Sequence, residues 1–321
     1  MAGEGAVFLA APFVVVALVA GDRGLKIATI QNCHSGPTAQ FLTKALGNPE
    51  IEQFRLDVVG WNDPAAQEAF LDRVATADLV LAQRTRQPLL SPAALKANFG
   101  DRLLLVSNMH YAGLTPDCCY VGQRDGRVDG PMSYHSSVII DAYKRGLSVA
   151  DCLKLFSPEG FADLRLFDVH EEALAELAAR DAQVPVKIVP IIRRFLTTDR
   201  LFYTMNHPTM FLVSRYMMAL LRHLGIRHRR VDTAGIRDVL KAGQVLPIHD
   251  FVAAHFELKY RSTQLYQNHA NFMDLRQVVE GFYKAYAAKP RESITVGGVP
   301  RPVYAADPER FGHLIGAQPI A

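Results

Sequence analysis

The first hundred residues alternate short apolar runs with longer segments whose apolar residues recur at helical spacing. The runs at 26–30, 54–58, 79–82 and 103–106 are typical of short strands, the second of them half exposed. Helices are expected at 36–46, after Asp63-Pro64 and after Ser91-Pro92, where capping residues precede proline. Strands separated by helices of this length need crossover connections, so the pattern predicts an α/β fold with a mostly parallel sheet and flanking helices.

The second half of the chain is predicted to be largely helical and packed against that sheet region. Helical spacing of apolar residues appears at 134–144, 148–156, 168–180, 210–224 and 272–287. Asp168 and Glu171 resemble a capping box that opens the third of these helices. The segment 186–195 contains Pro190 and fits a strand or a broken helix. The tail after Lys289 is rich in proline and glycine and is expected to wrap the surface.

These patterns divide the chain into three parts. Residues 1–24 form an N-terminal apolar extension, 25–125 an α/β sheet region, and 126–321 a mostly helical region integrated with the sheet as one domain. The run 6–20 is short for a membrane span. It also lacks the basic residues that precede the apolar core of a signal peptide. A signal, an anchor and a simple extension therefore stay open for residues 1–24.

Composition narrows the classes of function. With 49% apolar residues, 21% charged residues and a formal charge of +3, the 321-residue chain has the composition of a soluble globular protein and no basic cluster for nucleic acid. Its four cysteines show no CxxC spacing, which favours reduced thiols and a cytoplasmic location. The six-residue spacing of His249 and His255 suits no zinc site, so no metal is predicted. Neither a P-loop nor a GxGxxG motif occurs.

Polar and aromatic residues follow each predicted strand, where ligands bind in sheets of this kind. They are Gln31 to Ser35 after the first strand, Trp61 and Asn62 after the second, Gln83 and Arg84 after the third, and Asn108 to Tyr111 after the fourth. Loops are commonly polar, so one such position decides little. Because polar or aromatic residues follow all four successive strands, the pattern indicates a ligand-binding site at this edge of the sheet.

The segment from Gln31 through Asn32 to Gly36 is the strongest candidate. A strand runs directly into a helix whose N-cap is expected to be Ser35, and free N–H groups at a helix N-terminus bind anions. Cys33 just before that helix is expected to have a lowered pKa, and the same N–H groups could hold an oxyanion. The alternative is that Cys33 is a small buried residue and Ser35 only a cap.

A second candidate precedes the strong helix at 210–224. His207 is expected at the N-terminus of that helix, with Asn206 beside it and Pro208 fixing the turn. A histidine in that position tends toward its neutral form, which suits a general base. An ordinary helix-capping histidine is the alternative.

These segments resemble the WcbI-type family of polysaccharide-biosynthesis acetyltransferases. The resemblance rests on the strand that ends in Asn32-Cys33, on the segment 78–83 (Asp-Leu-Val-Leu-Ala-Gln), and on Arg200-Leu201-Phe202 followed by Asn206-His207-Pro208. The order of these motifs over about residues 25–225 matches the family. Gln31 and His34 depart from the Gly-Asn-Cys-Gln that the family usually has.

The resemblance implies an unusual α/β fold, binding of coenzyme A or acetyl-CoA, and O-acetylation of a capsular or other surface glycan. Gln83, Asn108 and Asn206 are further candidates for binding the cofactor. Four arginines are candidates for its phosphates, with solvated surface charge as the alternative; they are Arg84, Arg86, Arg193 and Arg194. Tyr134 and His135 are expected to line the acceptor pocket, Tyr134 also as a cofactor contact.

The favoured mechanism is direct transfer of an acyl group from CoA to a sugar hydroxyl. His207, or else His34, removes the hydroxyl proton, and N–H groups near Cys33 hold the oxyanion. An acyl-Cys33 intermediate is the close variant.

Two rivals of other kinds stay open. One is an SGNH-like esterase or deacetylase with Ser35 as nucleophile and His207 as base. The other is a non-catalytic nucleotide- or glycan-binding protein. The expected partners are an acyl-CoA donor and a sugar or polysaccharide acceptor, with no nucleic acid. Peripheral association with a membrane-bound biosynthetic complex is left open.

Overall fold

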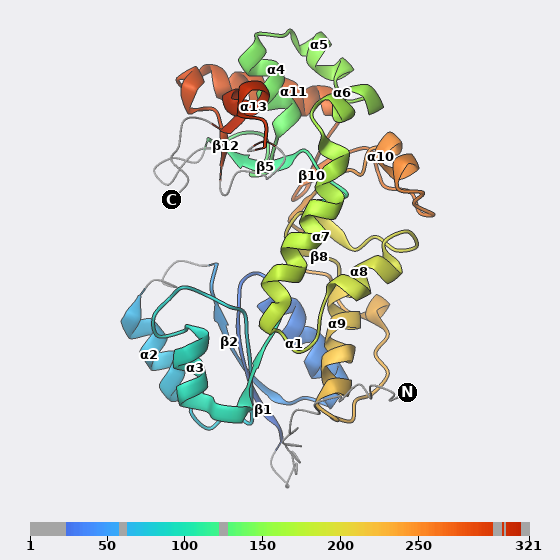
Figure 1. Ribbon diagram of the computed structural model, residues 1–321. Helices are drawn as coiled ribbons and strands as arrows, with labels where there is room; N and C mark the ends of the chain where they lie inside the picture. Colours follow the sequence, from blue (N-terminus) through green and yellow to red (C-terminus); the bar gives the residue numbers. More distant parts are fainter. Residues whose placement is uncertain (1–23, 58–62, 122–127, 298–303, 305, 316–321) are drawn as a thin grey trace, which may run out of the picture. The chain divides into compact units, whose positions relative to one another are not determined.

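The structure, a computed structural model, describes residues 24–57, 63–121, 128–297, 304 and 306–315 (Figure 1). Two units make up the chain. The first comprises residues up to Val106 together with Met217–Val231, and the second comprises Ser107–Tyr216 together with residues from Asp232 onward. The seam predicted near residue 125 falls inside the second unit. The apolar run 6–20, Trp61 and Asn62 lie outside the described residues.

The first unit is built on a four-stranded sheet. Its strands are β1 (Lys26–Gln31), β2 (Glu50–Arg55), β3 (Leu79–Ala82) and β4 (Leu103–Leu105). They stand in the order β2-β1-β3-β4, and every pair is parallel. Three helices connect them, namely α1 (Ser35–Leu46), α2 (Pro64–Arg73) and α3 (Pro92–Phe99). The parallel sheet and its flanking helices confirm the predicted fold class.

Alternation along the strands decides which helix covers which face of this sheet. Ala28, Ile30 and Val80 point to one face and form a buried cluster with Phe70 of α2 and Phe99 of α3. The residues between them in the strands point to the other face because side chains alternate along a strand. In Figure 1, α2 and α3 lie on one side of the sheet and α1 on the other. Both faces are therefore covered, as a parallel sheet requires.

The predicted helix ends of this unit are mostly confirmed. Asp63 accepts a hydrogen bond from the Ala65 N–H at 2.9 Å, and Ser91 accepts one from the Ala94 N–H at 3.3 Å. Gly47 ends α1 with a φ of 75°, in the left-handed region that favours glycine. The strand predicted at 54–58 was misplaced. It covers Glu50–Arg55, because Glu-Ile-Glu-Gln-Phe-Arg alternates equally well and pairs residue by residue with β1.

The second unit combines short antiparallel sheets with many helices. The sheets are β12-β5-β6, from Val296–Gly297, Cys118–Val121 and His135–Ser136; β11-β10-β9, from Asn271–Met273, Tyr266–Asn268 and Gln244–Val245; and the hairpin β7-β8, from Phe202–Thr204 and His207–Pro208. The helices are α4 (Ser137–Arg145), α5 (Val149–Lys154), α6 (Pro158–Asp163), α7 (Val169–Arg180), α8 (Val189–Phe195), α10 (Asp250–His255), α11 (Leu275–Ala287) and α13 (Pro308–Ile315). Helix α9 (Met210–His223) begins in this unit and ends in the first.

Several predictions for the second half need correction. Helix α7 starts as expected, but Asp168 makes no side-chain cap, because its carboxylate binds the Arg165 guanidinium at 2.8 Å instead. Helix α4 starts at Ser137 and not at Tyr134, since His135 and Ser136 pair with β5. Pro190 lies in the first turn of α8, where a missing N–H costs no hydrogen bond. That segment is a helix.

The tail after Lys289 is part of the core and does not merely wrap the surface. Strand β12 extends the sheet of β5, and α13 packs against α4. Tyr304 is buried and its hydroxyl donates to Ser137 Oγ at 2.8 Å. Phe311 and Leu314 are buried as well. The signal missed in the sequence was the helical spacing of apolar residues in the short segment 308–315, which begins with a proline.

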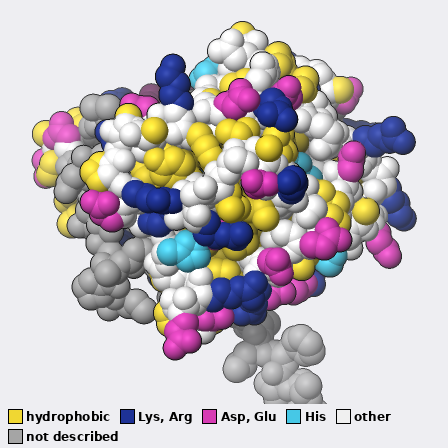
Figure 2. Space-filling model, turned by 90° about the horizontal axis from the view of Figure 1, so that it is seen from above, with side chains coloured by type: hydrophobic (Ala, Val, Ile, Leu, Met, Phe, Trp, Pro, Cys, Tyr) yellow, Lys and Arg dark blue, Asp and Glu magenta, His cyan; other side chains and the backbone are white. Residues whose placement is uncertain are grey.

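No helix in the described ranges is long and apolar enough to cross a bilayer. On the face shown in Figure 2, basic and acidic side chains are interspersed and do not gather into one large area of a single sign. This agrees with the small formal charge of +3.

Substitution of Phe311 by alanine tests the tail as a core element. We expect Phe311→Ala to lower the free energy of unfolding by about 3–5 kcal/mol, the usual cost of emptying a buried phenylalanine site. Exposed Glu309 on the same helix is the control, and Glu309→Ala should cost less than about 1 kcal/mol. Denaturant unfolding measures both. Equal, small losses would show that α13 contributes little to the core.

Candidate functional site

The order of strands in the first unit creates a position where ligands can enter. Strand β2 lies beyond β1 on one side, and β3 and β4 lie on the other, so the direction of the connections reverses between β1 and β3. Loops that follow such neighbouring strands diverge to opposite faces and leave a crevice at the carboxyl ends. Gln31 is the last residue of β1, and Gln83 follows β3 directly. Both predicted strand-end segments therefore meet at this position.

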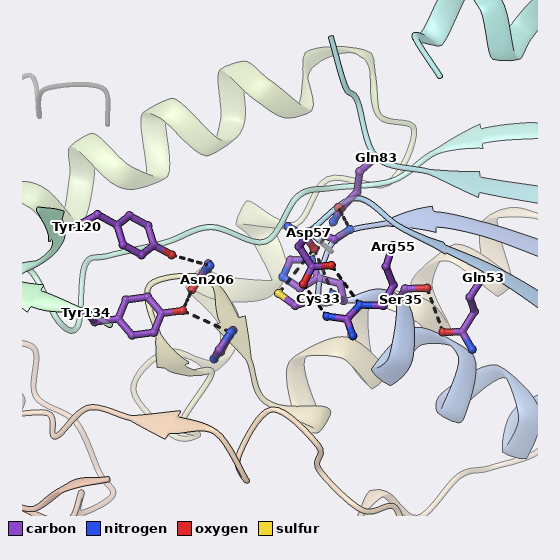
Figure 3. A network of polar contacts seen from close by, with 12 residues as sticks. Cys33, Ser35, Gln53, Arg55, Asp57, Gln83, Tyr120, Tyr134 and Asn206 are labelled. Atoms are coloured by element: carbon purple, nitrogen blue, oxygen red, sulfur yellow. Dashed lines mark hydrogen bonds and ion pairs between the residues drawn. The ribbon is translucent and has the colours of Figure 1, made fainter. Parts of the chain in front are cut away.

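Gln83 ties the loop after β1 to the end of β3 (Figure 3). Its Oε1 accepts from the Asn32 N–H at 2.9 Å, and its Nε2 lies 2.8 Å from His34 Nδ1. An amide nitrogen is only a donor, so His34 Nδ1 is the acceptor and the ring proton is on Nε2. His34 is buried. A buried ring whose lone pair already accepts a hydrogen bond is poorly placed as a general base.

Asn32 shapes the turn that presents Cys33. Its Oδ1 accepts from the His34 N–H at 3.1 Å, and its backbone carbonyl accepts from the Ser35 N–H at 3.0 Å. The Cys33 sulfur lies 3.9 Å from the same Oδ1. Cys33 is half-buried, whereas the other three cysteines are buried. The turn therefore presents this one thiol at the switch in strand order.

The expected low pKa of Cys33 is wrong. Burial, with a smaller contribution from the Asp57 carboxylate, raises the pKa of this thiol to about 12, while the Arg55 guanidinium and a backbone hydrogen bond oppose the shift. Arg55 binds Asp57 through two hydrogen bonds, of 3.1 and 2.6 Å, so its positive charge is largely neutralised by that carboxylate and stabilises the Cys33 thiolate little. At neutral pH Cys33 is a thiol, not a thiolate.

Arg55 and Asp57 were missed from sequence. They stand two apart at the end of an edge strand, and that spacing places two side chains on the same face. An Arg-x-Asp pair at a strand end was the available signal, but the prediction had shifted the strand past this point.

Ser35 is the first residue of α1 and not its cap. His34 occupies the cap position without a side-chain hydrogen bond. The Ser35 hydroxyl is fully buried, 2.8 Å from Thr29 Oγ1, and it donates to Gln53 Oε1 at 3.1 Å. A hydroxyl held in this way is not exposed to a substrate. This geometry argues against Ser35 as the nucleophile of an esterase.

The N-terminus of α1 fits an anionic group. Pro37 has no N–H to satisfy, and no acceptor for the Gly36 N–H exists among the described residues. A side chain built at Gly36 would meet nothing within 4 Å, so a ligand can approach the backbone there. Gln31 has a structural role instead, because its Oε1 accepts from the Thr38 hydroxyl at 3.0 Å.

The second unit holds a separate cluster around Asn206 (Figure 3). Asn206 Oδ1 accepts from the Tyr134 hydroxyl at 2.5 Å and from the Thr204 hydroxyl at 3.0 Å, and its Nδ2 donates to Tyr120 Oη at 3.3 Å. Tyr134 Oη also lies 3.4 Å from His207 Nε2. His207 belongs to strand β8, opposite Thr204, and not to a helix N-terminus as predicted. The hairpin β7-β8 therefore positions this histidine.

Tyr120 was not among the predicted residues. Its ring centroid lies 5.4 Å from that of Tyr134, and the rings meet because β5 and β6 bring residues 118–121 and 135–136 side by side. Burial raises the pKa of Tyr134, so its phenol stays protonated at neutral pH. His135 was predicted to line the acceptor pocket, and it does line a cavity of this unit. It lies in the core, with Nδ1 2.8 Å from Tyr286 Oη, and burial lowers its pKa to about 4.

The remaining candidates are more dispersed. Arg84 and Arg86 are exposed in the loop after β3. Arg193 pairs with Glu171 at 2.8 Å, and Arg194 lies over the Phe195 ring at 5.2 Å. Asn108 is half-buried in the second unit. No group of three His, Cys, Asp or Glu side chains in the described ranges is arranged to hold a metal ion.

Comparison with known proteins agrees with these features. The family model described as polysaccharide biosynthesis enzyme WcbI matches residues 26–229, which include both clusters. The chain belongs to the WcbI family. No curated protein matches it at a significant level.

A solved structure shares the WcbI fold over almost the whole chain. It is described as WcbI, a novel polysaccharide biosynthesis enzyme, in its native form without a disulfide bond between CoA and a cysteine. The two chains are 19% identical and superpose with a TM-score of 0.66, over 90% of this chain and 94% of the other. At this identity the likeness shows the fold alone. The predicted family resemblance is confirmed, and the chain is a polysaccharide biosynthesis enzyme by family.

The Arg55–Asp57 pair makes the reactivity of Cys33 testable. With a pKa of about 12, the thiolate fraction at pH 8 is on the order of 10⁻⁴, and alkylation is correspondingly slow. Asp57→Asn removes a negative charge and frees Arg55, so the pKa should fall. Each unit of that fall should speed labelling by iodoacetamide about tenfold at pH 8.

The control is Glu52→Gln, which removes a carboxylate from the same strand, one that pairs with Arg73 at 3.2 Å. Labelling of Cys33 in this variant should match that of the parent chain. Peptide mass spectrometry follows each cysteine separately. An unchanged rate in Asp57→Asn would show that the carboxylate does not control the thiol.

Proposed function

We propose that this chain transfers an acyl group, most simply acetyl, from CoA to a sugar hydroxyl during the synthesis of a capsular or other surface polysaccharide. The observation that carries the proposal is the half-buried Cys33 at the switch in strand order, beside the open N-terminus of α1. This is the kind of place where a thiol-bearing ligand with phosphates can bind. The four free cysteines favour the cytoplasm as its location.

The residues of the first unit fit a CoA donor. The Gly36 N–H and the positive end of α1 suit a phosphate or a developing oxyanion. Arg84 in the loop after β3 is exposed and available to phosphates. Cys33 is the cysteine we infer to lie near the donor thiol, because the three others are buried. The related WcbI structure is described as native protein without a disulfide bond between CoA and a cysteine; this pairing of CoA with a cysteine in its description supports the inference.

His207 is the residue we propose as the base for the acceptor. Bound acyl-CoA supplies an activated thioester, and the protein must remove a proton from a sugar hydroxyl that is otherwise a weak nucleophile. As the sugar oxygen forms a bond to the acyl carbon, His207 takes the hydroxyl proton, and the C–S bond breaks with the CoA thiolate as leaving group. The Tyr134 hydroxyl, held by Asn206 Oδ1, lies 3.4 Å from His207 Nε2 and orients the histidine ring.

We expect CoA to bind with a dissociation constant in the micromolar range and more weakly as salt rises, because phosphate contacts are screened. Isothermal calorimetry measures both. Oxidised CoA (the disulfide) should also exchange with Cys33, forming a mixed disulfide and releasing one CoA thiol. The exchange should be slow at neutral pH and faster as the pH rises, because the attacking species is the thiolate and the pKa of Cys33 is about 12.

Cys33→Ser should abolish this adduct, while Cys152→Ser, which alters a buried thiol, should keep it. Intact-protein mass spectrometry distinguishes the two variants. Absence of binding heat at millimolar CoA, or equal adducts in both variants, would contradict a donor site at Cys33. CoA binding without turnover on any glycan would favour a binding protein over an enzyme.

The two candidate bases are separated by making the same substitution at each. His207→Gln should leave CoA binding nearly intact and lower turnover about 10²–10⁴-fold, the worth of a positioned acid–base group. The acidic limb of the kcat/KM profile should disappear with it. His34→Gln replaces the buried ring by an amide whose oxygen can still accept from Gln83 Nε2. Because His34 has a structural role, this variant should retain most activity. Loss of activity in His34→Gln with an intact fold, and none in His207→Gln, would reverse the assignment.

A further inference from the structure

A cavity of about 130 Å³ lies in the second unit, next to the cluster around Asn206. Tyr120 lines it and also accepts the hydrogen bond from Asn206 Nδ2, so the cavity and the cluster share a side chain. A single water needs about 10–15 Å³ by the same measure, so this space holds several waters or part of a small ligand.

Gln244 holds two polar residues of the cavity lining, Ser133 and Asn268, in place. Gln244 Oε1 accepts from the Ser133 N–H at 3.2 Å, and Gln244 Nε2 donates to Ser133 Oγ at 3.2 Å and to Asn268 Oδ1 at 3.1 Å. Asn268 Nδ2 donates to the Pro131 carbonyl at 2.9 Å. The Ser133 hydroxyl therefore keeps its own hydrogen to donate, and Asn268 Oδ1 keeps a second lone pair.

Asp129 brings a negative charge to the cavity. Asp129 is exposed, and it is the one ionised side chain among the described residues that line the space. His135, which also lines it, is neutral at pH 7 because burial lowers its pKa to about 4. A carboxylate accepts hydrogen bonds from hydroxyl groups but repels a second carboxylate or a phosphate.

The other walls are apolar. Val121, Val128 and Met132 are buried residues that contribute to the lining. A sugar ring presents C–H groups on its faces and hydroxyls around its edge, so it needs an apolar wall together with fixed donors and acceptors. This cavity offers both.

A larger and more open groove of about 510 Å³ is less suited to a ligand. Its cations are already engaged: Lys144 donates to the Ile294 carbonyl at 2.9 Å, Arg145 to Asp141 at 3.0 Å, and Arg291 to the Tyr143 carbonyl at 2.7 Å. These hydrogen bonds link the C-terminal end of α4 to the segment around Arg291 and Ile294. The groove is therefore accounted for by structure.

We propose that the cavity at Tyr120, Asp129 and Ser133 is the acceptor subsite and that it binds an uncharged sugar residue of the glycan. Hydroxyls of the sugar donate to Asp129 and Asn268 and accept from Ser133. A uronic acid is excluded by the Asp129 carboxylate. The assignment as acceptor site rests on the proposed acyl transfer, whereas the binding of an uncharged sugar does not.

Ligand-observed NMR on the full chain tests the subsite, with methyl glycosides of glucose, galactose and mannose and the methyl glycoside of glucuronic acid as probes. At least one neutral glycoside should bind, and the uronide should bind at least tenfold more weakly. Asp129→Asn should remove most of this discrimination. Ser133→Ala should weaken the neutral glycoside roughly fivefold to tenfold, the worth of one hydrogen bond.

Glu292→Gln is the matched control, because it neutralises an exposed carboxylate in the other groove of the same unit and should change neither affinity. Binding of CoA with no binding of any neutral glycoside would overturn the subsite and leave the proposed function standing. Equal discrimination in the parent chain and in Asp129→Asn would also overturn it. Glycoside binding that depends on Asp129, in a chain that does not bind CoA, would support the sugar site and reject the transfer.

Discussion

The two-armed contact of Gln83 is the constraint on which the candidate donor site depends. One amide group holds both the Asn32 N–H and the His34 ring, at 2.9 and 2.8 Å. Because the Asn32 N–H fixes which end of the amide is the oxygen, the other end must donate, and the tautomer of His34 follows. The turn that presents Cys33 is thus set by a residue fifty positions away in the chain, at the end of the neighbouring strand. Loss of either arm would remove one of the two hydrogen bonds by which the buried Gln83 holds the turn.

The same loop shows how position and protonation can be decided by different parts of a structure. Strand order places Cys33 beside the switch between β1 and β3, but the protonation of its thiol is governed by burial and by Asp57, just after β2. The helix N-terminus alone would favour the thiolate. Desolvation and a nearby carboxylate outweigh it, since both act directly on the sulfur. A helix N-terminus after a cysteine is therefore an incomplete basis for predicting an activated thiol.

Much of the first unit could be predicted because local signals and tertiary structure agree there. Asp63 and Ser91 cap helices as expected, and the run 79–82 is a strand with those bounds. The motifs at Asn32 and at Asn206 were both found from residue types and order. Contacts between distant segments were not. Tyr120 reaches its cluster through strand pairing, which no local pattern reveals, and the buried hydroxyl of Ser35 depends on Gln53 eighteen residues later. Arg55 was missed because the predicted strand ended at residue 58, whereas the strand ends at Arg55 itself. His207 was expected at a helix N-terminus because the apolar pattern of the following helix is clear. It pairs with Thr204 instead and so belongs to a strand.

The raised pKa of Cys33 also bears on the choice between the two routes of transfer. An acyl-cysteine route requires the thiolate to attack a thioester, and with a pKa of about 12 only on the order of 10⁻⁵ of the thiol is ionised at pH 7. The neighbouring His34 is not available as the base for this thiol through Nδ1, because that nitrogen accepts a hydrogen bond from Gln83 at 2.8 Å. A neutral thiol at this position is small, polarisable and resistant to acylation. For the acyl transfer proposed above, such a residue can pack beside a donor thioester without being acylated, which favours direct attack by the acceptor hydroxyl over a covalent intermediate.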